Sequence, residues 1–439
     1  MMASAGCGTG RHKRGRRWPL ALAFWPLALA WAGGAAAGAG GAGEAYSLAA
    51  LEELARTGSP ALQAAAAGVD GARAGVETAR AFPNPEVEYL AGNTRYRPGV
   101  DGVSGAVGSI GLSQPLDLPF RRTPRIAAAR AGLAAAHAGY AAIEADWIAD
   151  LRRAYFDMLR RAAETANAGE DLALMQSVQA KIALRVQKGD APRFEMIRAE
   201  ADLLNVRKAA QAAALREEQA RLRLRALVGP DLPADFAIAG QLEAPLALAP
   251  LARLEEQALA ANPALAEARA AAEQARYRLR YEEAGRLPQV ALRATREADR
   301  ELRQFKLGVS LTVPLWDRKS GPVHEAEAQR AQADLALGAR AFAIRQQLEI
   351  AWRQYEVAQT QVSALENGLV AQARSAVTVS ESAYRAGERG LIDVLDAQRV
   401  YRSARADLIA SRFELASAWV DIQRLTAAET IPPLNRKLP

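Results

Sequence analysis

An internal duplication constrains the fold of this chain more than any other feature of its sequence. The run SPAL at Ser59 returns as NPAL at Asn262, and the run LSQPL at Leu112 returns as LTVPL at Leu311, at offsets of 203 and 199 residues. Stacked repeat units have periods of about 20 to 50 residues, so this period is that of a whole domain. We therefore expect two similar halves. The expected parts are a first repeat at 46–228, a linker at 229–250, a second repeat at 251–428 and a C-terminal tail at 429–439.

Each half is expected to end in two long helices. Both segments are rich in Ala, Leu, Glu, Arg and Gln, which have the highest helix propensities, and they contain few Gly or Pro residues. The first helix of the pair runs from about 123 to 186 and its counterpart from about 322 to 384. At 1.5 Å per residue each would be roughly 95 Å long. Helices of this length are rare in globular domains.

The second helix of each pair carries a heptad repeat. In the later half, one seam position holds large side chains and the other mostly small ones: Val394, Tyr401, Leu408, Leu415, Ile422 and Ala397, Ala404, Ser411, Ala418, Leu425. The first half repeats the register from Met196 to Leu227 with one interruption at Glu217. Such a register is the seam of a coiled coil, where small residues let helices approach closely. Taken alone, it is equally typical of a plain coiled-coil rod.

Four strand-like segments precede the long helices. The segment 305–315 alternates apolar and small or polar residues without a break, and aromatic residues stand near its two ends. A strand of a soluble sandwich alternates in this way, and so does a strand that faces lipid on one side and a lumen on the other. The other expected strands are 86–96, 104–114 and, with weaker alternation, 289–295. Four strands cannot close a barrel, and lipid does not tolerate an open sheet edge. If these strands enter a membrane, several chains must share one barrel.

The N-terminus has the three-part order of a secretory signal peptide. A basic run at 11–17 is followed by mostly apolar residues at 18–32 and by small residues at 33–43. We expect residues 1–45 to be removed, which changes the net charge from 56 − 49 = +7 to 51 − 48 = +3. The excess of basic over acidic residues therefore lies largely in the export signal and does not indicate a nucleic-acid partner. The alternative is an uncleaved N-terminal anchor. No later run of eighteen apolar residues occurs.

The composition argues against several classes of enzyme. The chain has one Cys and three His residues, too few for a Cys or His metal cage or for a disulfide framework. It also has no phosphate-binding Gly-rich loop and no recognisable nucleophile constellation. We therefore expect no enzymatic activity, no cofactor and no dedicated metal site.

Several motifs resemble the TolC family of outer-membrane efflux channels. They are FPNPEV at 82–87, LSQPLDL at 112–118, VSLTVPLWDR at 309–318 and, as the most specific, YRAGERGLIDVLDAQ at 384–398. Together with the signal peptide, the duplication and the heptads, the resemblance covers about 46–428. Among subfamilies, the chain is similar to the CzcC-type branch, which serves heavy-metal efflux pumps.

The resemblance implies a fold and an assembly. The chain would be mainly α with a small transmembrane β part, and three copies would share a twelve-stranded barrel in the outer membrane. Twelve helices would continue this barrel as a tunnel through the periplasm. The resemblance also implies a passive channel that works with a periplasmic adaptor and an inner-membrane pump, of the RND type or of an ABC secretion system. It does not identify the exported substrate, because selection occurs largely in the pump.

The motif at 384–398 is the candidate gate. Gly387 and Gly390 predict a tight turn between two long helices, with Gly189 at the matching turn of the first half. Asp393 and Asp396 then fall three residues apart on one side of the following helix. Threefold repetition would place six carboxylates around one opening, which should attract cations and repel anions.

The resemblance assigns further residues to the closed gate. It implies that Tyr384 and Arg389 form polar links that hold the entrance shut, and that Glu195 is an acidic gate position of the first half. Phe194 stands where the family usually has a small polar residue. Simpler interpretations remain open: Asp393 suits the positive end of a helix dipole, and Arg389 suits a solvated turn.

A second class of protein is also compatible with the heptads. A soluble periplasmic coiled-coil protein, such as a pump adaptor or a structural rod, would carry similar helices. An adaptor would be expected to have compact β-domains flanking its helical hairpin, whereas this chain has a strand pair before each hairpin. The two hypotheses predict different cell fractions, the outer membrane and the soluble periplasm.

Overall fold

The computed structural model describes residues 45–243 and 246–427. The predicted signal peptide, apart from Ala45, and the predicted tail at 429–439 lie outside the described residues. The same order of elements occurs twice, as the duplication predicts. The first half contains β1 (Ala45–Tyr46), α1 (Leu48–Gly58), α2 (Pro60–Arg80), β2 (Glu86–Thr94), β3 (Gly105–Pro115), α3 (Pro119–Lys188) and α4 (Arg193–Val228). The second contains β4 (Ala237–Ile238), α5 (Leu251–Ala261), α6 (Pro263–Ala284), β5 (Gln289–Ala298), β6 (Arg303–Thr312), α7 (Ser320–Ala364), the π-helical turn η1 (Leu365–Leu369), α8 (Val370–Arg385) and α9 (Leu391–Thr426).

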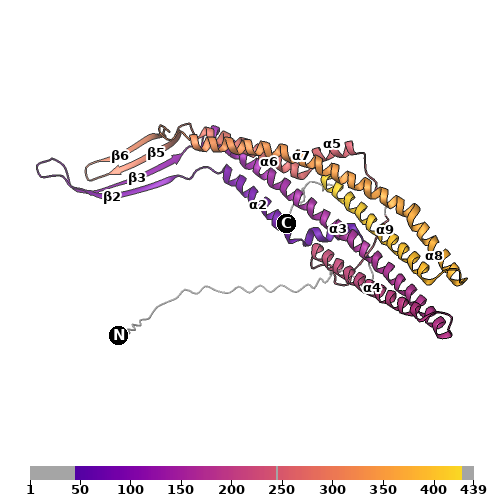
Figure 1. Ribbon diagram of the computed structural model, residues 1–439. Helices are drawn as coiled ribbons and strands as arrows, with labels where there is room; N and C mark the ends of the chain where they lie inside the picture. The colour runs from indigo at the N-terminus through magenta and orange to yellow at the C-terminus, as the bar shows by residue number, and fades with distance from the viewer. Residues whose placement is uncertain (1–44, 244–245, 428–439) are drawn as a thin grey trace, which may run out of the picture. The chain divides into compact units, whose positions relative to one another are not determined.

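The four long strands form one antiparallel sheet in the order β2-β3-β5-β6 (Figure 1). The two halves meet where β3 pairs with β5, with Ser113 opposite Arg293. One face of the sheet is apolar, and its large side chains are 46% to 77% exposed: Val87, Tyr89, Ile110, Leu112, Leu292, Phe305, Leu307, Val309, Leu311. The other face carries polar groups, including Glu88, Thr295 and Lys306 in one cross-strand row. The alternation of the sequence is thus that of a membrane strand, and β2 and β6 remain as open edges.

The long helices confirm the helical prediction except at one turn. Helix α3 has 70 residues, roughly 105 Å at 1.5 Å per residue. The predicted single helix over 322–384 is wrong at η1, which interrupts the α-helical hydrogen bonding between α7 and α8. Asn367 and Gly368 lie in this turn and favour the α-helix least. Arg412 of α9 connects this turn to a neighbouring helix, because its guanidinium donates to Glu366 at 2.7 Å and also bonds Glu243.

The predicted heptad seams are buried against neighbouring helices. No seam residue of α9 is exposed, and Val394, Ala404, Ala418 and Ile422 are fully buried. In α4 the seam is also covered, including Glu217, which pairs with Arg221 on its own helix. Helix α3 contacts α4, α6 and α9, and α9 contacts α7 and α8 as well. The seams therefore hold each chain's helices side by side.

The segment at 229–250 is more than a linker. It contributes Leu232, Phe236 and Leu242 to the buried core, and its strand β4 pairs in parallel with β1. Two tyrosines on the long helices donate to its carbonyl oxygens: Tyr155 to Ala239, and Tyr355 to Leu246 at 2.7 Å. Each half thus uses one tyrosine hydroxyl to hold the connection between them.

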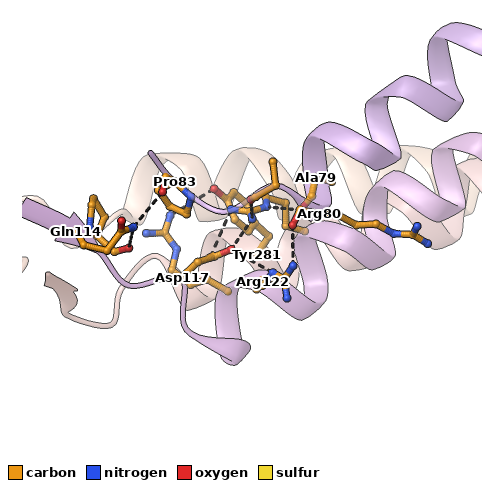
Figure 2. Close-up of polar contacts among 11 residues, drawn as sticks. Ala79, Arg80, Pro83, Gln114, Asp117, Arg122 and Tyr281 are labelled. Carbon is orange, nitrogen blue, oxygen red and sulfur yellow. Dashed lines mark hydrogen bonds and ion pairs between the residues drawn. The ribbon is translucent and has the colours of Figure 1, made fainter. Parts of the chain in front are cut away.

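A buried carboxylate joins the first strand pair to the long helices (Figure 2). Asp117, only 6% exposed, pairs with Arg125 at 2.5 Å and with Arg122 at 3.5 Å. The same two guanidiniums donate to backbone oxygens at the end of α2: Arg122 to Arg80 at 2.6 Å and Arg125 to Ala79 at 3.1 Å. Gln114 donates to the oxygen of Pro83 at 3.0 Å. The motifs FPNPEV and LSQPLDL therefore contact each other, and their polar residues set where the sheet leaves the helices.

Candidate functional site

The two helical hairpins end in turns of the same geometry. Gly189 has φ 83° and Gly387 has φ 78°, the left-handed region that favours glycine. Behind each glycine the next residue bonds back five residues, Asp190 to Arg185 at 2.8 Å and Glu388 to Ala383 at 2.9 Å. These bonds satisfy carbonyls at the helix end and form the Schellman motif. Gly390 has φ −78° and precedes the first turn of α9, so only Gly387 of the predicted pair requires a glycine conformation.

Gly387→Ala is expected to lower the free energy of unfolding by about 1 to 2 kcal/mol per chain, because an L side chain resists positive φ. Gly390→Ala is the matched control and should cost less, since its φ suits any residue. Neither glycine has an atom closer than 4.0 Å to the place where a Cβ would lie, so steric clash does not confuse the comparison. Urea unfolding of the detergent-solubilised protein measures both. Equal losses for the two variants would show that the left-handed turn is not the source of the effect.

The two aspartates of the candidate gate lie in different surroundings. Asp393 is half-buried in the first turn of α9, where its charge also suits the helix dipole. Asp396 is exposed and pairs with Arg399, one turn further on, at 3.0 Å. The pair with Arg399 offsets part of the negative charge of Asp396. Both carboxylates lie in the first two turns of α9, and Asp393 has no ion pair in the described chain to offset its charge.

Tyr384 links the two hairpin ends. Its hydroxyl donates to Oε2 of Glu195, at the start of α4, across 3.3 Å. The guanidinium of Arg185, at the end of α3, lies over the Tyr384 ring at 4.9 Å. Burial raises the pKa of Tyr384, and the negative charge of Glu195 raises it further. The hydroxyl therefore stays protonated at neutral pH and acts as the donor.

An apolar cluster stabilises this link. It is shared by α3, α4 and α9, with Tyr384 packed against it: Met175, Ile182, Ala199, Val206, Leu391, Leu395. A second polar contact joins α8 to α9, where buried Gln398 donates to Glu381 at 3.3 Å. Sequence reasoning missed Arg185, although a basic residue in the last turn of a helix is a recognisable signal.

The structure does not bring all predicted gate residues together. Tyr384 and Glu195 meet, whereas Arg389 is exposed and makes no hydrogen bond or ion pair within the described part of the chain. Phe194 is also exposed. Within one chain, Tyr384, Glu195 and Arg185 therefore lie in contact, and Arg389 takes no part in this contact.

The described residues contain neither a candidate metal-binding cluster nor a membrane-spanning helix. Among the described residues, no group of three or more His, Cys, Asp or Glu side chains is placed to hold a metal ion. None of the helices between 45 and 427 that the structure describes has the length and apolar character to cross a membrane.

Known proteins resemble the chain in sequence and in fold. The sequence model of the family described as outer membrane efflux protein matches residues 51–230 and 254–428. The cobalt-zinc-cadmium resistance protein CzcC of Cupriavidus metallidurans is 26% identical over 368 residues, 83% of this chain and 86% of that protein. The solved channel CusC has a TM-score of 0.75 at 17% identity, covering 86% of this chain and 91% of that one. The open MtrE channel of Neisseria gonorrhoeae has a TM-score of 0.73 at 20% identity, covering 86% and 88%.

The family match covers most of both repeats and well over half of the chain. The structural matches show the same fold: mainly α, in duplicated halves, with a small β part. They confirm the family to which the sequence motifs pointed, and they argue against a soluble adaptor and against an enzyme. The chain belongs to the outer membrane efflux protein family and is an efflux channel of the outer membrane, with its helices in the periplasm.

Proposed function

We propose that three copies of this chain form one passive exit duct, through which an inner-membrane pump exports cations, heavy metals among them. The observation that carries the proposal is the open sheet. Its apolar face is exposed and its edge strands β2 and β6 have no further neighbour in the described chain. Lipid does not tolerate such edges, so β2 of one copy is expected to pair with β6 of the next. Three sheets of four strands would make a closed barrel.

The helices offer a second surface for neighbouring copies. Helix α7 leaves a stripe of large apolar residues 57% to 75% exposed at near-heptad spacing: Leu335, Phe342, Ile350, Val357. Helix α4 has a similar exposed stripe at Ile197, Leu204, Leu215 and Leu222. Because α4 and α7 lie on opposite sides of the α3 and α9 pair, these stripes are available to two different neighbours. Such seams support a tunnel in which each copy packs between two others.

The gate residues support cation passage. Three copies would bring Asp393 and Asp396 together as six carboxylates at the periplasmic end, a composition that attracts cations. The relative CzcC is named for resistance to cobalt, zinc and cadmium. Channels of this family belong to tripartite efflux systems, with a periplasmic adaptor and an inner-membrane pump. We infer that the pump is of the RND type. Energy for export would come from this pump, and the mature chain would begin near residue 45.

The mass of the detergent-solubilised particle tests the assembly. We expect three copies per particle by light scattering corrected for detergent, and we expect Phe342→Glu to shift the particle toward single copies because it places a charge in the α7 seam. Gln359→Glu, at an exposed position on a different side of the same helix, is the control and should leave three copies. A stable single copy of the unmodified chain in mild detergent would overturn the proposal.

A further inference from the structure

The connection between β6 and α7 exposes a large aromatic side chain directly beyond the sheet. The last pair of the β5–β6 ladder is Gln289 with Thr312, and the chain then continues from 313 to 319 into α7. Within this connection Trp316 is 93% exposed, more than any other large apolar side chain in the described residues. Leu315 and, on the incoming connection, Leu287 are exposed as well. Trp side chains are enriched at the depth of the lipid headgroups, where membrane-spanning segments end.

The connection that holds this tryptophan and the one beside it also carry cations without an ion pair in the described chain. Lys319 binds the neighbouring carboxylate of Asp317 at 2.7 Å, which leaves the exposed guanidiniums of Arg286 and Arg318. Among the described residues neither guanidinium forms an ion pair, and Arg318 donates only to its own turn, to the oxygen of Leu315 at 3.4 Å. The two connections adjoin, since a Cβ on Gly285 would lie 3.7 Å from Cγ of Lys319.

The matching position of the first half is built differently. There Asp117 is buried and binds both Arg122 and Arg125, and Arg122 lies over the Phe82 ring at 4.0 Å. The cations of the first half are therefore occupied within the chain. Of these two matching connections, the one after β6 is the one that presents an exposed guanidinium without an ion pair in the described chain.

We propose that Arg286, Arg318 and Trp316 form a binding site for the headgroup of an anionic phospholipid in the periplasm-facing leaflet of the outer membrane. Guanidinium groups bind phosphate oxygens through paired hydrogen bonds, and the indole and Leu287 accommodate the adjoining glycerol and acyl carbons. The site carries a net positive charge, because its three cations, Arg286, Arg318 and Lys319, outnumber its one carboxylate, Asp317. Charge complementarity therefore favours an anionic lipid over a zwitterionic one. The site rests on the outer-membrane location of the chain.

Native mass spectrometry of the detergent-solubilised protein, given equal amounts of phosphatidylglycerol and phosphatidylcholine, tests this site. Lipid retained per chain is counted, so the result is independent of the assembly proposed above. We expect the unmodified chain to retain phosphatidylglycerol selectively. The double variant Arg286→Gln with Arg318→Gln should bind this lipid about thirtyfold more weakly, because the two cations contribute roughly equally to its affinity. The charge-preserving pair Arg286→Lys with Arg318→Lys should retain most of the binding.

The control removes two exposed arginines that lie far along the helices, Arg340→Gln with Arg374→Gln. It should retain phosphatidylglycerol as the unmodified chain does, which separates the site from the loss of net charge. An excess of inorganic phosphate should not displace the lipid, because it lacks the apolar part that Trp316 contacts. Equal retention of the two lipids, or undiminished retention in the Arg286 and Arg318 double variant, would overturn the proposal.

Discussion

Asp393→Ala combined with Asp396→Ala is expected to weaken block of the channel by Mg²⁺ from the periplasmic side about tenfold or more in planar bilayers. The reason is the removal of six carboxylates from one opening in the proposed trimer, where each contributes to the attraction of a divalent ion. The single variants should differ. Because Arg399 already offsets the charge of Asp396 at 3.0 Å, Asp393→Ala alone should account for more of the effect than Asp396→Ala alone.

The control for this experiment also removes two carboxylates per chain, but at positions of α9 away from the turn. Asp407 and Glu414 are exposed carboxylates further along α9, and neither forms an ion pair in the described chain. Replacing both with Ala should leave Mg²⁺ block nearly unchanged if the opening is at the turn. If the double Asp393 and Asp396 variant is blocked by the same concentration of Mg²⁺ as the unmodified channel, the gate assignment is wrong.

Tyr384→Phe is expected to raise the fraction of open channels about a hundredfold. The variant removes one hydrogen bond to the Glu195 carboxylate, worth about 1 kcal/mol per copy at its length of 3.3 Å. Three copies opening together add to roughly 3 kcal/mol, or a hundredfold in the ratio of open to closed states. Single-channel recordings at neutral pH measure the open fraction directly. The raised pKa of Tyr384 means that the hydroxyl of the unmodified chain stays protonated under these conditions.

Tyr401→Phe provides the matched comparison. Tyr401 also lies in a long helix with a guanidinium over its ring, Arg405 at 5.5 Å, but its hydroxyl forms no hydrogen bond in the described chain. Its replacement should leave the open fraction unchanged. A similar rise in both variants would indicate general loosening of the helices, and no rise in Tyr384→Phe would remove Tyr384 from the closed-state contacts.

Local patterns predicted most of the fold. Helix propensity located the long helices, the heptads of α4 and α9 identified their buried sides, and alternation in β6 identified its apolar face. These signals succeed because each depends on residues within a few turns or one strand. The extent of β5 was underestimated, at 289–295 instead of Gln289–Ala298, since Arg296 breaks the alternation on the apolar face.

Contacts between distant residues could not be predicted in this way. The hydroxyl of Tyr384 meets a carboxylate 189 residues earlier, and Arg185 meets the same ring from a third helix. No local pattern encodes such a meeting, and only the resemblance to a known family placed Tyr384 and Glu195 in one site. The same resemblance also linked Arg389 to Tyr384, a contact that one chain does not make. The buried role of 229–250 was missed for a related reason, because short apolar runs without period look like a connection.

The π-helical turn makes the two hairpins mechanically unequal. Helix α3 stays α-helical through 70 residues, with Pro124 near its start as its interior proline, whereas the corresponding path in the second half changes pattern at Leu365–Leu369. A π-helical turn has hydrogen bonds between residues five apart instead of four, and long helices often bend at such turns. Each copy would therefore place one continuous helix, α3, and one interrupted path, α7 to α8, in the tunnel wall. The wall is expected to bend more easily at the interrupted paths.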